Sequence, residues 1–232
     1  MSIKFTTYFQ QAHIQNCYLC KQSSQQFICS TCEIAFPRVE CKRNCGNLLN
    51  RPDIQNALGQ VEFDALICPY EFRWPIDKLI KDFKFNKRDH LSQTLSKHLL
   101  NTLQQRLALF PRPDAILPVP THWKRYWFRG FNQAHAIASP LSKSLNIPIR
   151  SDLCKRVQFS TTQVNSSGNQ RRENLKSAFQ AGECCGVSRI AIVDDVVTTG
   201  STANAVIRAL KTQYPHLSFE MWALAISSAN LD

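Results

Sequence analysis

The chain of 232 residues is long enough to bury one core and to carry a small additional module. Hydrophobic residues make up 44% and charged residues 19%, which excludes an intrinsically disordered chain. The net charge of +11 suits an anionic partner, either a polyphosphate ligand or a nucleic acid. Residues 1–11 contain no apolar run, and no stretch approaches the roughly 20 apolar residues of a membrane helix. We therefore expect a cytoplasmic protein without membrane insertion.

Six of the ten cysteines lie within residues 17–45. Four of them form two Cys-x-x-Cys pairs separated by eight residues, a spacing that suits tetrahedral zinc. A small segment with little core needs such a metal, because metal binding and folding are then one event. Cys41 and Cys45 form a looser pair, which is the alternative to the second Cys-x-x-Cys pair. The predicted zinc ligands are Cys17, Cys20, Cys29 and Cys32.

The amino-acid composition changes along the chain. Residues 1–50 are polar and cysteine-rich and predict the zinc-binding module, residues 51–62 resemble a connector, and residues 63–232 form the main domain. Apolar runs predict strands at 64–72, 115–120, 187–193 and 217–226, and a further strand within 147–157. Between these strands, apolar periodicity predicts helices at 74–83, 89–103, 131–145 and 201–213, with Pro140 kinking or dividing the third. This alternation predicts an α/β fold, a mainly parallel sheet with flanking helices.

Residues 190–203 are the most informative segment. An apolar strand ends at Asp194 and Asp195, and a loop of small hydroxyl residues around Gly200 leads into a helix. The carboxyl ends of parallel strands are where open α/β sheets bind ligands, and loop amides at a helix N-terminus suit a phosphate. Carboxylates beside a phosphate site would repel a bare anion, so they indicate sugar hydroxyls or a metal that accompanies the ligand.

This segment resembles the motif with which type I phosphoribosyltransferases bind 5-phosphoribosyl pyrophosphate (PRPP). The resemblance implies a type I phosphoribosyltransferase fold and a PRPP ligand accompanied by Mg²⁺. It also implies that the two acids hold the ribose hydroxyls and that residues 198–202, the phosphate loop, hold the 5′-phosphate. The ligand-binding residues expected on this basis are Asp194, Asp195, Val196, Val197, Thr198, Thr199, Gly200, Ser201 and Thr202.

Other segments are similar to the ComF family of competence proteins. The resembling segments are Pro118-Val119-Pro120 followed by Arg129-Gly130-Phe131-Asn132-Gln133-Ala134, then Lys84-Phe85, Lys155-Arg156, Thr162-Gln163 and Arg172-Glu173-Asn174-Leu175, together with the N-terminal cysteine pairs. Two loops depart from the family pattern. Residues 164–168 replace a Gly-Leu-Ser-like turn, and residues 86–88 replace an early Gly after Lys-Phe.

In related enzymes the loop after the Pro-Val-Pro strand contacts the pyrophosphate. The resemblance therefore implies an anion contact in the segment 121–125, with two later arginines as further contacts. The residues concerned are Thr121, Lys124, Arg125, Arg171 and Arg172. Arginine suits this role because its guanidinium can bind phosphate with two parallel hydrogen bonds.

A basic stretch adds a nucleic-acid hypothesis. Residues 121–182 hold ten basic and two acidic residues, a local charge of +8. Aromatic and basic residues alternate at its start, which favours base stacking with backbone neutralisation. The alternative is that these aromatics pack the segment onto the domain. The nucleic-acid candidates are Trp123, Lys124, Arg125, Tyr126, Trp127 and Arg129.

The sequence thus predicts a PRPP-binding, phosphoribosyltransferase-like protein that handles single-stranded DNA during DNA uptake, with the uptake machinery as a partner. Two alternatives stay open. One is an active phosphoribosyltransferase that displaces pyrophosphate from PRPP with an unidentified acceptor. The other is a regulator that senses PRPP and moves residues 160–170. We identify no acceptor-recognition residue and no general base, so the sequence does not choose between binding and turnover.

Overall fold

The computed structural model describes residues 15–39, 46–86, 89–121, 130–157 and 178–227. The chain separates into two compact units, Met1–Phe36 and Pro37–Asp232. The division of the chain into residues 1–50, 51–62 and 63–232 stays a prediction. Within the described part of the chain, no helix has both the length and the apolar character needed to cross a membrane.

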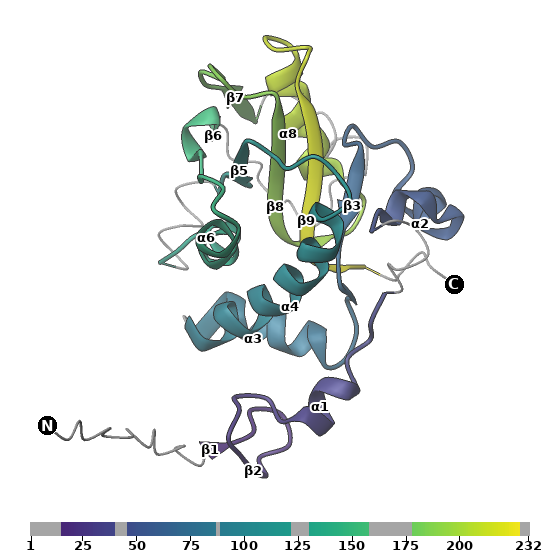
Figure 1. The fold of residues 1–232 in the computed structure, drawn as a ribbon, viewed down its shortest axis with the longest axis vertical. Helices are drawn as coiled ribbons and strands as arrows, with labels where there is room; N and C mark the ends of the chain where they lie inside the picture. The colour runs from purple at the N-terminus through teal and green to yellow at the C-terminus, as the bar shows by residue number, and fades with distance from the viewer. Residues whose placement is uncertain (1–14, 40–45, 87–88, 122–129, 158–177, 228–232) are drawn as a thin grey trace, which may run out of the picture. The chain divides into compact units, whose positions relative to one another are not determined.

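A parallel sheet forms the centre of the larger unit. Strand β8 (Arg189–Val197) lies between β9 (Ser218–Ile226) and β5 (Ala115–Pro118). Strand β3 (Ala65–Ile67) pairs with the first part of β9, and β4 (Tyr70–Glu71) pairs with its end. All of these pairs are parallel (Figure 1). The α/β fold class with a mainly parallel sheet is therefore confirmed.

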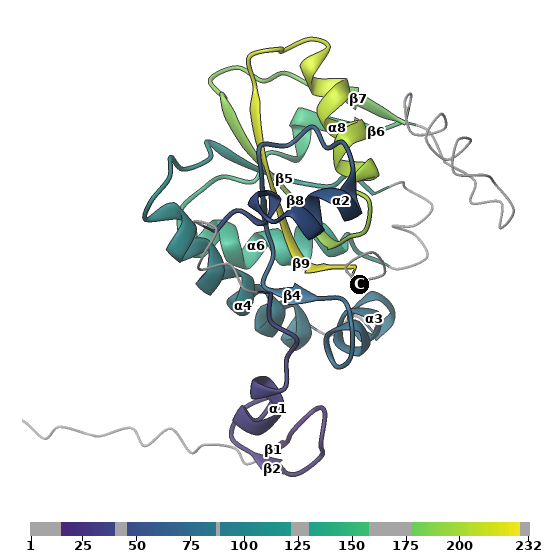
Figure 2. The same cartoon turned by 90° about the vertical axis from the view of Figure 1, so that its right-hand side faces the viewer.

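Helices cover both faces of this sheet. Helices α2 (Pro52–Leu58) and α8 (Ser201–Lys211) lie on one face, and α4 (Asp89–Leu107) and α6 (Gln133–Leu145) lie on the other (Figure 2). Both faces of β8 are buried, which explains its continuous apolar run. Helix α3 (Ile76–Asn86) precedes α4.

Three predicted elements differ in detail. The strand expected at 64–72 is split into β3 and β4, because Pro69 between them has no N–H to donate to the ladder. The Pro69 carbonyl accepts a hydrogen bond from Val39 N–H at 2.9 Å. The segment 147–157, expected to hold a strand, contains the short strand β6 (Cys154–Arg156), which the 3₁₀ turn η3 (Ser151–Leu153) precedes. Strand β6 leaves the main sheet and pairs antiparallel with β7 (Phe179–Ala181). Helix α6 spans Pro140 as one helix, so the proline does not divide it.

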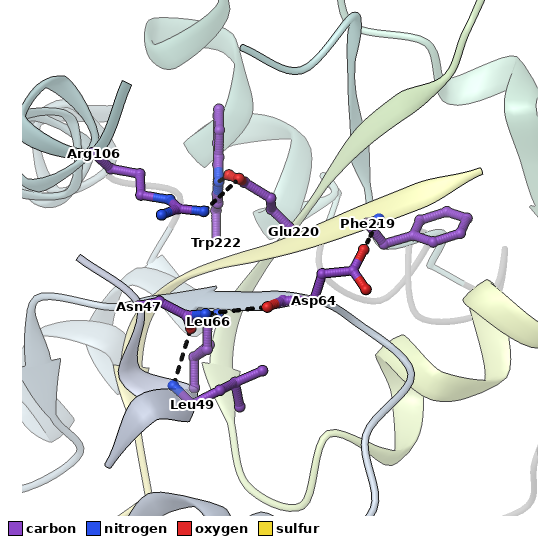
Figure 3. Close-up of polar contacts among 8 residues, drawn as sticks. All are labelled: Asn47, Leu49, Asp64, Leu66, Arg106, Phe219, Glu220 and Trp222. Atoms are coloured by element: carbon purple, nitrogen blue, oxygen red, sulfur yellow. Dashed lines mark hydrogen bonds and ion pairs between the residues drawn. The ribbon is translucent and has the colours of Figure 1, made fainter. Parts of the chain in front are cut away.

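Polar side chains fasten the sheet to its surroundings (Figure 3). Arg106 of α4 reaches Glu220 of β9 at 3.1 Å, and Trp222 Nε1 donates to the second carboxylate oxygen at 3.0 Å. The Arg106 and Glu220 side chains are only 9% and 2% exposed, so this ion pair is buried. Asn47 Oδ1 accepts from Leu66 N–H of β3 at 3.0 Å and caps the 3₁₀ turn η2 (Leu48–Asn50). These bonds fix β3 and β9 in register beside β8.

The N-terminal unit is built from short elements. Strands β1 (Gln15–Asn16) and β2 (Ser23–Ser24) pair antiparallel, and a helix α1 (Ser30–Ile34) follows. Its buried residues are few, with Cys17 and Ile28 among them. A unit with so small a core depends on cross-linking groups for its stability.

Candidate functional site

The phosphate loop joins the end of β8 to the start of α8. Gly200 is the N-cap of α8 and has φ +67°, a left-handed conformation that favours glycine. No described side chain caps this helix end, so the N–H groups of its first turn are left for another acceptor. Those N–H groups and the helix dipole together favour a bound anion.

A pocket opens at this junction. Seven of the nine predicted ligand residues line it, whereas Asp195 and Thr199 do not. The lining residues are Asp194, Val196, Val197, Thr198, Gly200, Ser201, Thr202 and Ala203. The structure therefore brings one carboxylate, the hydroxyls of the loop and the helix N-terminus into a single hollow.

The segment before β3 supports the loop from behind. A Cβ atom at position 200 would lie 3.2 Å from Val61 Cγ1 and 3.3 Å from Phe63 Cε1. Asn204 of α8 accepts from Glu62 N–H at 2.8 Å and donates to Gln60 O at 3.0 Å. The sequence interpretation missed this role of residues 60–63, because the segment carries no periodic pattern and its partners lie far away along the chain.

The two adjacent acids have different environments. Asp194 lines the pocket, and its Oδ1 accepts the N–H of Asp195 at 2.8 Å. Burial raises the pKa of Asp194 to about 7, and the charge of Asp195 adds to the increase. Asp195 instead pairs with Lys84 of α3, with 2.8 Å between Oδ2 and Nζ. The two carboxylates therefore have different partners, although Asp195 is close enough to raise the pKa of Asp194.

Lys84 lies next to the candidate site, but the sequence interpretation did not name it as a ligand candidate. The available signal was the Lys84-Phe85 pair within the family resemblance. The neighbouring Phe83 packs edge-to-face on Phe131, with ring centroids 5.5 Å apart. Asn132 caps α6 and donates to Val119 O at 3.3 Å, which ties this region to the end of β5.

The pyrophosphate candidates start at the same edge of the sheet. Pro118 of β5 lies opposite Val193 of β8, and Val119 N–H donates to Val193 O at 2.9 Å. The half-buried Thr121 lies two residues after Val119. The other anion and nucleic-acid candidates lie outside the described residues: Trp123, Lys124, Arg125, Tyr126, Trp127, Arg129, Arg171 and Arg172.

The N-terminal unit contains a candidate metal site. The ligand atoms of the four predicted cysteines all lie within 4.8 Å of one another, and Cys20 Sγ and Cys29 Sγ are 3.7 Å apart. Thiolates bound tetrahedrally at Zn–S distances of about 2.3 Å would be about 3.8 Å apart, so the arrangement fits zinc. Cys17 Sγ accepts the N–H of Cys29 at 3.3 Å. Burial opposes ionisation of Cys17, but backbone donors outweigh it and lower the pKa to about 6.

Local backbone geometry brings the two cysteine pairs together. Lys21 has φ +64°, and its N–H donates to Cys17 O at 2.9 Å, which closes the turn after the first pair. Cys29 is the N-cap of α1 and Cys32 lies within that helix, so the second pair spans one helical turn. The alternative pair, Cys41 and Cys45, lies outside the described residues.

Known proteins resemble this chain over most of its length. No protein-family model matches it. Competence protein F of Haemophilus influenzae is 33% identical over 188 residues, which cover 79% of this chain and 78% of that protein. DNA utilization protein YhgH of Escherichia coli O157:H7 is 31% identical over 212 residues, 90% of this chain and 88% of that protein. The protein of the same name from Salmonella typhi is 29% identical over 215 residues, 92% and 91% of the two chains. With this identity over most of both chains, the chain belongs to the ComF family.

Proposed function

We propose that this protein binds PRPP with Mg²⁺ at the carboxyl end of β8, and that it serves DNA uptake or utilization. One observation carries the ligand assignment: Asp194 and the uncapped N-terminus of α8 line the same pocket. A ligand that has a phosphate at one end and hydroxyls close by satisfies both groups, whereas a bare anion would be repelled by the carboxylate.

Each part of the ligand then has a protein partner. The N–H groups and hydroxyls of the phosphate loop would bind the 5′-phosphate. Asp194 and Asp195 would accept hydrogen bonds from the ribose hydroxyls. Magnesium supplies neutralisation of the pyrophosphate charge when it is bound with the ligand. Thr121 and the anion candidates Lys124, Arg125, Arg171 and Arg172 would contact the pyrophosphate.

The role in DNA handling rests on the relatives. They are named for competence and for DNA utilization, and the chain covers most of their length. The local charge of +8 in residues 121–182 supports single-stranded DNA as the partner. The segment 123–129, with its interleaved aromatic and basic residues, is the proposed contact.

Calorimetric titration tests the ligand assignment. Wild type should bind PRPP in the presence of Mg²⁺, and the variant with Asp194→Ala and Asp195→Ala should lose binding while keeping its fold. Asp152→Ala is the matched control, because this exposed acid pairs with Arg150 away from the pocket. Wild-type affinity in the double variant would refute the assignment. Pyrophosphate release with a panel of nucleobases then separates an enzyme from a PRPP-binding or PRPP-sensing protein.

Salt dependence tests the DNA contact. The affinity for a single strand should fall with salt, with a log–log slope of about −0.7 per phosphate contacted. Replacing Lys124 and Arg125 by Ala should flatten this slope. Trp127→Ala should instead weaken binding by about 1–3 kcal/mol with little change of slope, because stacking releases no counterions. Absence of binding at low salt, where attraction is greatest, would refute the proposal.

A further inference from the structure

Helix α3 contacts Asp195 of β8 through Lys84. Lys78 and Lys81 of this helix pair with acids of the same helix, at 2.9 Å to Asp82 and 2.8 Å to Asp77. Lys84, one turn further along, bonds instead to Asp195 on β8 at 2.8 Å. The first two lysine side chains are more than half exposed, whereas Lys84 is 24% and Asp195 11% exposed. The Lys84–Asp195 pair is therefore the most shielded from solvent of the three.

The position of Asp195 makes this pair relevant to the site. Asp195 does not line the pocket, although the preceding residue, Asp194, does. The backbone N–H of Asp195 donates to the Asp194 carboxylate at 2.8 Å, so the main chain links the two acids. A negative carboxylate with so little exposure would be costly without a cation beside it. Lys84 supplies that cation.

We infer that Lys84 is a positioning residue of the ligand site, which holds the Asp195 carboxylate in place beside Asp194. This inference rests on the proposed PRPP binding. Lys84 thereby makes the last turn of α3 part of the site. Phe83 extends the link, because its ring packs on Phe131, just before the cap of α6.

The test compares three probes that report on different parts of the site: PRPP with Mg²⁺, ribose 5-phosphate and inorganic phosphate. Lys84→Met keeps the aliphatic stem and removes the charge. It should weaken PRPP and ribose 5-phosphate by the same factor, about tenfold or more, and leave inorganic phosphate unchanged. Lys84→Arg should restore most of the affinity. The matched control is Lys81→Met, which removes the exposed ion pair on the same helix and should bind all three probes like wild type.

A double-mutant cycle separates positioning from direct contact. Once Asp195→Asn has removed the carboxylate, adding Lys84→Met should cost no further affinity. Additive losses, or a loss confined to PRPP, would show that Lys84 contacts the pyrophosphate itself and would overturn the inference. A Lys84→Met variant that binds PRPP within twofold of the wild-type affinity would also overturn the inference. If wild type binds none of the sugar phosphates, the proposed function fails and the inference fails with it, a result that differs from a selective failure of the Lys84 variants.

Discussion

Replacing Gly200 by Ala tests how far the backbone of the phosphate loop determines the site. A residue with a Cβ pays about 1–2 kcal/mol in the left-handed conformation that Gly200 adopts at φ +67°. The added methyl would also lie 3.2 Å from Val61 and 3.3 Å from Phe63, which is closer than ordinary van der Waals contact. Either the Val61 and Phe63 side chains or the loop must shift, and a loop that shifts takes its N–H groups with it.

Gly186→Ala is the matched control. Gly186 has φ +71°, and no atom lies within 4 Å of the position that an added Cβ would occupy, so it carries the conformational cost without the crowding. It precedes the amino end of β8, whereas Gly200 follows the carboxyl end. At about 2–4 °C per kcal/mol for a chain of this size, Gly186→Ala should lower Tm by about 2–8 °C. Gly200→Ala should lower it by at least as much.

Binding separates the two variants. Loss of one hydrogen bond to a charged phosphate costs about 1.5–3 kcal/mol, or roughly 10- to 100-fold in affinity. We expect this loss for PRPP with Gly200→Ala and none with Gly186→Ala, by calorimetric titration with Mg²⁺. Adding Val61→Ala to Gly200→Ala should recover part of the lost stability, because it removes one crowding partner. Wild-type affinity and Tm in Gly200→Ala would refute the reasoning about the loop.

Three further predictions concern other parts of the molecule. Metal analysis should find one zinc ion per chain, which Cys17→Ser should lose. Cys68→Ser should keep the zinc, since the buried Cys68 lies outside the cysteine cluster. Zinc retained in Cys17→Ser would contradict the proposed site. Arg106→Met should lower the free energy of unfolding in urea by about 3–5 kcal/mol, because it leaves the Glu220 carboxylate buried without its cation, and a loss below 1 kcal/mol would argue against the pair. The pKa of Asp194 is raised from 3.8 to about 7 on folding, so the folded state holds an extra proton between these values and loses stability as the pH rises through 7. Asp194→Asn should therefore be more stable than wild type at pH 8 and equal to it near pH 4, and denaturation curves with the same difference at both pH values would contradict this.

Local features of this protein followed well from the sequence. The two Cys-x-x-Cys pairs and the strand-loop-helix of residues 190–203 were predicted because their parts are neighbours along the chain. Spacing within one turn or one strand end fixes distances before any tertiary contact forms. The parallel sheet was predicted for a similar reason, since apolar runs that alternate with amphipathic helices leave few other ways to bury them.

The structure of the irregular segments was predicted less well from the sequence. The segment 147–157 joins β5 through an isolated parallel bridge between Ile149 and Ile116, and then continues as η3 and β6. The pairing of β6 with β7 depends on residues 179–181, to which no local pattern points. Pro140 lies within α6 as one continuous helix, although proline removes a backbone donor.

The sequence by itself identified residues 198–202 as the candidate ligand loop and two Cys-x-x-Cys pairs as candidate metal ligands. Only the tertiary structure decided how the two acids divide their roles, with Asp194 in the pocket and Asp195 held by Lys84. Likewise, only folding placed Val61 and Phe63 behind Gly200. The physical reason is that these contacts join segments far apart along the chain, and their geometry depends on how α3 and the residues before β3 pack against the sheet. A pattern of neighbouring residues records which groups can bind a ligand, whereas packing between distant segments determines where each group points.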